Sequence, residues 1–168
     1  MRTRLRLRAA VPDDVPDIVT LIGHLGYPVR EEALRRAFEL LRTVPEHAVI
    51  VAELDGAVCG LLAMSARPSL TLQGAVGVIQ ELVVRPAQRR REIGENLLQY
   101  AKGLAVERGY VRLECTVPAT HHAVADQFLL ERGFEIAATT TYRWTVLEGK
   151  NPRLPASTTT RRLRSIPA

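Results

Sequence analysis

Residues 80–110, QELVVRPAQRRREIGENLLQYAKGLAVERGY, contain the pattern that decides the fold. An apolar strand pattern at 81–84 is followed by Pro86 and the arginine cluster 89–91, and a helical pattern begins at Ile93. Apolar residues at three- and four-residue spacing predict that one face of this helix is buried. These residues are Ile93, Leu97, Leu98, Ala101, Leu104 and Ala105. The stretch therefore predicts a strand, a basic loop and a helix in direct succession.

The junction of the loop and the helix has the properties of a phosphate site. The first backbone N–H groups of a helix lack acceptors within it, and the helix dipole adds partial positive charge there. Arg89, Arg90 and Arg91 precede this end, and Gly94 would let a phosphate approach the backbone without meeting a β-carbon. The simpler alternative is a solvated basic turn before a packed helix.

The rest of the chain predicts strands and helices around this core. Further helices are expected from Pro12 to a break at Gly26, over 30–42, and over 122–131 with Gly133 closing the last. Asp55-Gly56 is typical of a hairpin turn, and a loop is expected over 68–74. The strands expected besides 75–84 are 3–9, 47–54, 57–66, 111–118, 134–137 and 139–147.

Length and composition favour one domain with a flexible end. The chain has 168 residues, of which 46% are hydrophobic, so one full core is expected. We expect that single domain to span 1–148. Residues 149–168 are basic, rich in proline and threonine, and poor in large apolar groups, so they predict a disordered or loosely docked tail.

Charge and cysteine usage exclude several classes of function. The net charge is +5, but four arginines and no acid lie within 151–168, which leaves residues 1–150 at +1. Nucleic-acid binding is therefore not expected. Cys59 and Cys115 show no metal-ligand spacing, so no metal is expected. The sequence has no apolar run near eighteen residues and no signal-like start, which predicts a cytoplasmic protein that does not span a membrane.

Two motifs resemble the GNAT superfamily of acyl-CoA-dependent N-acetyltransferases. The run 89–94, RRREIG, resembles the family loop Q/R-x-x-G-x-G/A, with Glu92 in place of the first glycine. The run 122–134, HAVADQFLLERGF, resembles N-x-x-A-x-x-F-Y-x-x-x-G-F, with His122 for the asparagine and Leu129 for the tyrosine. The resemblance covers about residues 3–147. It implies an α/β fold of order βααβββαβαββ, with a central mixed sheet flanked by helices on both faces.

The resemblance also implies a binding site for acetyl-CoA. Main-chain groups of Leu82, Val83 and Val84 would hold the pantetheine arm and polarise the thioester. The loop and the first helical turn would hold the pyrophosphate, and the later helix would contact the cofactor arm. These predicted contacts are Arg89, Arg90, Arg91, Glu92, Ile93, Gly94, Glu95, His122, Ala125 and Phe128. Because glutamate brings a β-carbon and a negative charge, we expect Glu92 to weaken cofactor binding without abolishing it.

The predicted reaction is transfer of an acetyl group to a primary amine of a small molecule by direct attack in a ternary complex. Glu81 matches the position of the base that removes a proton from the amine. Leu129 removes the usual acid that protonates the leaving sulfur, and His121, His122, Tyr142 or water could replace it. An acyl-enzyme on Cys115 is an alternative, although nothing nearby in the sequence lowers its pKa.

Other functions remain open at this level. One is a catalytically weakened sensor or structural module that binds acyl-CoA, and another is an acetyltransferase for protein or peptide amines. Acidic residues of the first two helices could attract polyamines or aminoglycosides, or form a solvated face. These residues are Asp13, Asp14, Asp17, Glu31, Glu32 and Glu39. The family resemblance also implies that a homodimer can form, with the closing strands as its interface.

Overall fold

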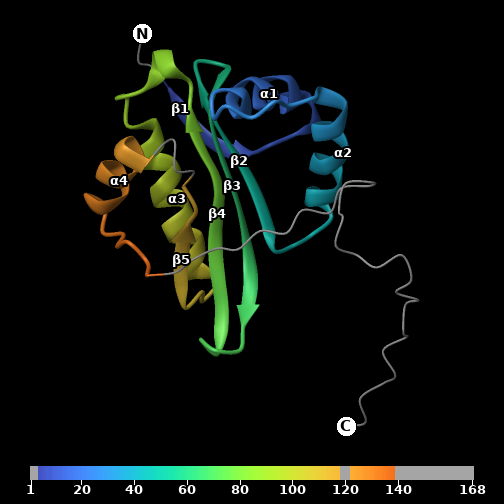
Figure 1. Cartoon of the computed structure of the whole chain (residues 1–168). Helices are drawn as coiled ribbons and strands as arrows, with labels where there is room; N and C mark the ends of the chain where they lie inside the picture. Colours follow the sequence, from blue (N-terminus) through green and yellow to red (C-terminus); the bar gives the residue numbers. More distant parts are fainter. Residues whose placement is uncertain (1–3, 118–121, 139–168) are drawn as a thin grey trace, which may run out of the picture. The chain divides into compact units, whose positions relative to one another are not determined.

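The computed structural model of the protein describes residues 4–117 and 122–138. The chain divides into two units, Met1–His122 and Ala123–Ala168. The first unit contains the sheet and three α-helices, and the second contains most of a further helix (Figure 1). The prediction of one domain over 1–148 remains a prediction.

The strands of the first unit form one mixed sheet in the order β1-β2-β3-β4-β5. β1 is Leu5–Ala9, β2 is His47–Leu54, β3 is Ala57–Ser69, β4 is Gly74–Val84 and β5 is Arg112–Cys115. Neighbouring strands from β1 to β4 are antiparallel, whereas β4 and β5 are parallel and joined through a helix. This arrangement confirms the predicted α/β class with a mixed sheet.

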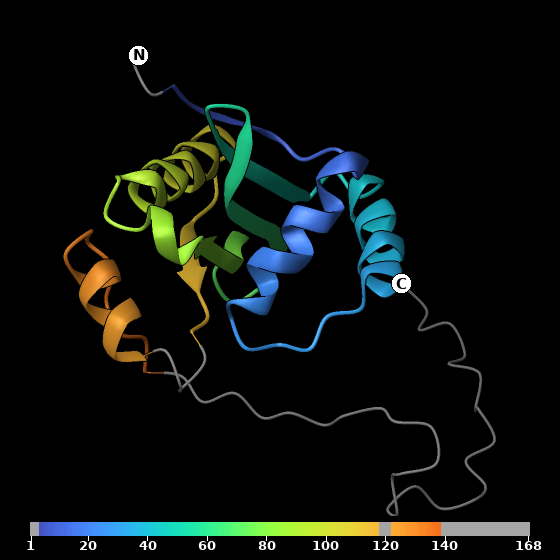
Figure 2. The ribbon, with the colours of Figure 1, turned by 90° about the horizontal axis from the view of Figure 1, so that it is seen from above.

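Helices cover both faces of this sheet (Figure 2). α1, Val15–Gly23, and α2, Glu31–Arg42, pack over one face, where Ile18, Leu21 and Phe38 join a core cluster with residues of β2, β3 and β4. α3, Ile93–Glu107, packs against β3 and β4. Its buried residues include those predicted at 93, 97, 98, 101 and 105. The periodicity of the sequence therefore identified the buried face of α3 correctly.

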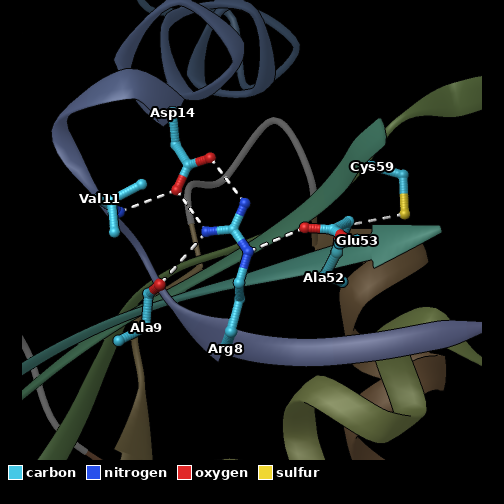
Figure 3. Close-up of polar contacts among 7 residues, drawn as sticks. All are labelled: Arg8, Ala9, Val11, Asp14, Ala52, Glu53 and Cys59. Carbon is cyan, nitrogen blue, oxygen red and sulfur yellow. Dashed lines mark hydrogen bonds and ion pairs between the residues drawn. The ribbon is translucent and has the colours of Figure 1, made fainter. Parts of the chain in front are cut away.

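A partly buried ion-pair cluster ties β1 to the start of α1 (Figure 3). The guanidinium of Arg8 donates to both carboxylate oxygens of Asp14, at 2.6 and 2.9 Å, and to Glu53 Oε2 on β2 at 2.9 Å. Asp14 Oδ2 also accepts the backbone N–H of Val11 at 2.8 Å. Asp14 is only 6% exposed, and its bonds to Arg8 hold the pKa of its carboxyl below the usual value.

Two predicted segments in the first unit have different bounds in the structure. The loop expected over 68–74 is only a short turn, because β3 continues to Ser69 and β4 begins at Gly74. Pro68 pairs with Ala75 at the end of this hairpin, where a missing N–H is tolerated. β5 is shorter than the strand expected over 111–118, since its pairing with β4 ends at Ile79 and Cys115. The hairpin predicted at Asp55-Gly56 is confirmed by positive φ angles of 50° and 86°.

The second unit contains most of α4, His122–Leu130, which confirms the predicted helix. Gly133 ends the following turn with a φ of +81°. The strand predicted over 134–137 is wrong, because residues 134–138 have no regular secondary structure. Ile136 is 77% exposed, so the alternating pattern there has no neighbouring strand to pack against within the described residues. The strand predicted over 139–147 and the tail lie outside the described part of the chain.

Candidate active site

A β-bulge in β4 sets the orientation of the predicted base. Ala63 of β3 pairs with Glu81, and the next residue, Met64, pairs with Ile79, so Gln80 is an extra residue in β4. Directly opposed residues share a face of the sheet, and neighbouring residues along a strand do not. Glu81 therefore lies on the face with Val83, which belongs to the α1 and α2 core cluster.

Beyond the bulge, the edge of β4 that faces β5 is open. The described ladder between these strands ends at Ile79 and Cys115, so residues 80–84 have no partner strand on that side within 4–117. The amide of Arg85 donates to Cys59 O of β3 at 2.8 Å. Because main-chain groups alternate along a strand, those of Leu82 and Val84 point to the open edge and those of Val83 to β3.

The loop after β4 has two residues in the left-handed region. A short 3₁₀ turn, Pro86–Gln88, leads into the exposed arginines, and Arg90 and Glu92 have φ angles of +64° and +59°. Glu92 stands where the family motif has its first glycine. The positive φ at this position explains why the motif has a glycine there, because glycine adopts this conformation without strain. The glutamate retains this conformation, and its carbonyl accepts the amide of Asn96 at 2.9 Å and Asn96 Nδ2 at 2.8 Å.

The start of α3 fits a bound pyrophosphate. Asn96 makes the first described intrahelical bond, so the amides of Ile93 and Gly94 precede any acceptor within the helix. Arg90 and Arg91 are exposed and make no ion pair with the described residues, which leaves both guanidinium groups available to phosphate. Glu95, the third residue of the helix, accepts a bond from Gln99 Nε2 at 2.8 Å.

Close packing fixes the position of this helix end on the sheet. A β-carbon added to Gly60 of β3 would lie 3.0 Å from methyl groups of Ile93 and Leu97, and 3.2 Å from the β-carbon of Ala52. Contacts this short are tighter than ordinary van der Waals packing. Gly60 therefore allows the first turn of α3 to approach β3 closely and holds the arginine loop beside the open edge of β4.

Arg85 and Gln88, at the start of the loop, were not predicted as functional. The guanidinium of Arg85 forms a short ion pair with Asp17, which joins the end of β4 to α1. Arg85 Nε and Gln88 Oε1 are buried and have no hydrogen-bond partner among the described residues. The sequence signal was weak, because Arg85 lies in the V-x-P run without periodicity and Asp17 is one of several acids at the start of a helix.

The Glu81 side chain lines a cavity of about 90 Å³ between the sheet and the helices α1 and α2. The other lining residues are all apolar: Val15, Ile18, Ile22, Leu34, Phe38, Leu41, Val49, Leu61 and Ala63. The Glu81 carboxyl makes no hydrogen bond or ion pair with the described residues, and burial raises its pKa. A larger hollow has a volume of about 200 Å³, and the described residues that line it all belong to 30–36 at the start of α2.

Most of the acidic residues in or near α1 and α2 form ion pairs with arginines. Asp14 pairs with Arg8, and Asp17 pairs with Arg85. On α2, Glu31 pairs with Arg35 at 2.8 Å and Glu39 with Arg42 at 3.0 Å. Of the six acids that the sequence offered for attracting a polycation, only Asp13 and Glu32 lack an ion pair within the described part of the chain.

Both cysteines are poor nucleophiles in this fold. The thiol of Cys59 is buried and donates to Ala52 O at 3.2 Å. Burial raises the pKa of Cys115 to about 11. A thiol with this pKa is almost entirely protonated at pH 7, and the thiolate is the reactive form.

The remaining predicted contacts lie in α4. His122 begins this helix, and Ala125 and Phe128 follow within it. The guanidinium of Arg132 lies 4.0 Å from the centre of the Phe128 ring, and its NH1 donates to Phe128 O at 2.9 Å. Leu129, in place of the family tyrosine, accepts the amide of Phe134 on its carbonyl.

The described residues contain no cluster of metal ligands and no helix that could span a membrane. No three His, Cys, Asp or Glu side chains within 4–117 and 122–138 come together in a way that could hold a metal ion. In the same residues, no helix has both the length and the apolar character needed to cross a bilayer.

The chain matches the model of the acetyltransferase (GNAT) family over residues 16–134. It is also 30% identical to an uncharacterized N-acetyltransferase of Archaeoglobus fulgidus over 125 residues, which cover 70% of this chain and 85% of the relative. The chain therefore belongs to the GNAT family of acetyltransferases. It is an acetyl-CoA-dependent N-acetyltransferase of this family.

Solved structures show the same fold. The aminoglycoside N-acetyltransferase AAC(6')-Iy in complex with CoA superposes with a TM-score of 0.76 at 15% identity, covering 86% of this chain and 97% of that chain. Glucosamine-6-phosphate N-acetyltransferase from Arabidopsis thaliana superposes with a TM-score of 0.71 at 18% identity, covering 84% of this chain and 98% of that chain. At these identities the likeness supports the fold, and the acceptors of these two enzymes remain their own.

Proposed function

We propose that this protein transfers the acetyl group of acetyl-CoA to a primary amine of a small molecule, by direct attack in a ternary complex. The observation that carries the proposal is the position of Glu81. Its carboxyl lines the apolar cavity without a partner among the described residues, and Glu81 directly precedes Leu82, whose main-chain groups point to the open edge of β4. Two of the solved structures with this fold are named for acetylation of small-molecule amines, which supports the same class of acceptor.

In this proposal the cofactor lies along the open edge of β4 and across the start of α3. Arg89, Arg90 and Arg91 bind the pyrophosphate together with the amides of Ile93 and Gly94. Leu82 and Val84 hold the pantetheine arm through their main-chain groups, and alternation favours this pair over Val83. Glu92 and Glu95 belong to the same turn, and the cofactor contacts of His122, Ala125 and Phe128 stay predictions from the sequence.

Glu81 acts as the base. A free amine is mostly ammonium at pH 7, and its nitrogen has no electron pair to donate until a proton leaves. The Glu81 carboxylate accepts that proton, and its raised pKa makes it a stronger base than an exposed glutamate. Acetyl-CoA, when bound, supplies the acetyl group and a thiolate leaving group.

The electron balance needs no further reactant. The amine nitrogen forms a bond to the acetyl carbon while the carbon–sulfur bond breaks and its electron pair remains on sulfur. Leu129 cannot donate a proton to that sulfur, so water is the proposed proton source. A thiolate with a pKa near that of cysteine, about 8.5, is a tolerable leaving group without a side-chain acid. The high pKa of the Cys115 thiol disfavours the acyl-enzyme route.

The test compares Glu81→Gln with the wild-type protein by release of free thiol from acetyl-CoA in the presence of amines. We expect kcat/KM to fall by about 10²- to 10⁴-fold, the usual contribution of a general base, with the Kd for acetyl-CoA unchanged by calorimetry. Glu107→Gln, at an exposed position near the end of α3, is the matched control and should keep full activity.

Two other results would redirect the proposal. Full activity of the Glu81→Gln variant would remove Glu81 from the mechanism. Binding of acetyl-CoA without thiol release from any amine would favour a binding module, and release only with peptides would favour a protein amine as the acceptor. A cytoplasmic location, a homodimer, and the absence of metal and nucleic-acid partners stay predictions from the sequence.

A further inference from the structure

We propose that the acceptor is a small amine with a single positive charge and a short aliphatic substituent, rather than a polyamine or an aminoglycoside. This inference rests on the proposed function, because it assigns the acceptor to the cavity beside Glu81. Three features of the cavity support it: the chemistry of its walls, its volume and the state of the acids around it.

The described walls of the cavity offer an ion-pair partner for one positive charge. Among the described residues, Glu81 is the single ionisable residue that lines it, and the wall opposite is formed by side chains such as Ile18, Phe38 and Leu61. An ammonium group would give the buried carboxylate the cationic partner that the described residues do not supply. A second ammonium or a row of hydroxyl groups would enter an apolar wall without hydrogen-bond partners, which is unfavourable.

The volume limits the length of the substituent. An apolar cavity of 150 Å³ holds benzene, so a cavity of about 90 Å³ holds about three to four carbon atoms. Leu41 and Ala63 are half-buried lining residues on α2 and β3, so the size of the side chain at each position can be changed.

The surroundings do not form a site for a polycation. Recognition of several ammonium groups requires several carboxylates that are free to pair with them. Asp17 and Glu39, like Asp14 and Glu31, are already engaged by arginines. Arg30 and Arg36 line the same hollow as Glu32, and they oppose the approach of cations there.

The experiment compares amines of matched length by thiol release with the full chain and acetyl-CoA. n-Butylamine and 1,4-diaminobutane have the same carbon chain and differ by the second ammonium. We expect kcat/KM to be at least tenfold higher for n-butylamine, with an optimum near four carbons in a series from ethylamine to octylamine. Kanamycin, a polycationic sugar, should be a poorer acceptor than n-butylamine.

Two cavity variants make the test specific. Leu41→Ala removes three carbons from the wall, so the optimum should move to longer amines. Ala63→Leu adds three carbons, so KM for n-butylamine should rise by about tenfold, as expected when a filled pocket excludes part of a ligand. Unchanged acetyl-CoA binding shows that each variant is folded. If Ala63→Leu fails this control, Leu41→Ala alone decides.

Binding of n-butylamine to the CoA-loaded protein, measured by calorimetry, separates the two proposals. Turnover that prefers the diamine or kanamycin, or that ignores chain length, overturns this inference and leaves the proposed function intact. Butylamine binding that is lost in Glu81→Gln, without any turnover, supports the inference and overturns the proposed reaction. Neither binding nor turnover of any amine overturns both.

Discussion

Ile79 and Glu81 are two residues apart in β4 and yet lie on opposite faces of the sheet. In a regular strand they would share a face, but Gln80 is an extra residue opposite β3 and reverses the alternation. Ile79 consequently shares the face of its β3 partner Met64, and Glu81 faces α1 and α2. The bulge thus places a carboxyl in an apolar cavity, and this placement has a cost in stability.

Replacing Glu81 with glutamine should stabilise the fold at pH 7. Burial raises the folded-state pKa of Glu81 above 4.5, so the charged form is less favourable in the folded protein than in the unfolded chain. We expect the free energy of unfolding to rise by about 1 kcal/mol in Glu81→Gln at pH 7. The difference should shrink as the pH falls through the raised pKa and vanish below about 4.5, where Glu81 is protonated in both states. Urea unfolding at several pH values measures it, and a gain that persists at pH 3.5 would contradict the electrostatic cause.

The conformation of Glu92 predicts that glycine improves the phosphate loop. At a φ of +59° a glutamate is strained, and its charge lies where phosphate is expected. Glu92→Gly should raise the free energy of unfolding by about 0.5–1 kcal/mol. The same variant should lower the Kd for acetyl-CoA by about fivefold.

Glu92→Gln is the control that separates the two causes, because it removes the charge and keeps the β-carbon. It should tighten cofactor binding without gaining stability. Equal Kd values for all three proteins, measured by calorimetry, would show that residue 92 does not approach the cofactor.

Substitution of Gly60 should destabilise the fold more than substitution of another glycine in the same region. In Gly60→Ala the new β-carbon meets Ile93 and Leu97 at 3.0 Å, so α3 must shift or the fold must strain. We expect a loss of about 1–3 kcal/mol in the free energy of unfolding, together with weaker binding of acetyl-CoA. Gly103→Ala, in the middle of α3 with open space around it, should instead gain about 0.5–1 kcal/mol. Thermal and urea unfolding of the pair test the packing argument, which equal losses would refute.

Loss of Arg8 should destabilise the protein at neutral pH. Arg8→Met leaves the Asp14 carboxylate buried without its cation, which we expect to cost about 2–3 kcal/mol, less than for a fully buried pair because the Arg8 side chain is 23% exposed. Arg6→Met, at an exposed position of the same strand, should change stability by less than about 0.5 kcal/mol.

The pH dependence identifies the carboxylate. The pKa of Asp14 is lowered in the folded state, so its contribution is complete above the unfolded value of about 3.8 and is lost as the pH falls through the lower folded value. The difference in the free energy of unfolding between Arg8→Met and the wild-type protein should therefore become smaller below pH 3.8. A gap that stays constant down to pH 2 would mean that packing of the arginine stem, and not the ion pair, is responsible.

The sequence was most informative where local rules coincide with the fold. The helical stripe from Ile93 to Ala105, the hairpin at Asp55-Gly56 and the strand before the arginines all follow from periodicity or turn chemistry. The strand over 134–137 failed because alternation describes one face of a segment and says nothing about whether a neighbouring strand is there to pair with it.

The candidate site could be derived from the sequence only in part. A motif pointed to the arginine loop and to Glu81, and their roles stay predictions, whereas the bulge at Gln80 depends on the register with β3, which is a property of two strands. The Arg85 and Asp17 pair joins residues far apart in the chain, and the apolar cavity is formed by residues of five different elements. Such relationships appear only after the chain has folded.

Helices α1 and α2 form much of the cavity wall, whereas the arginine loop leads into α3, and this separation makes the protein a practical scaffold for engineering. Residues of α1 and α2 can be randomised to fit other amines while the backbone edge and the arginines that would bind the cofactor keep their sequence. Acceptor preference and cofactor affinity could then be selected from two separate libraries of variants. Strand β4, which contributes to both sites, would be the one element common to the two.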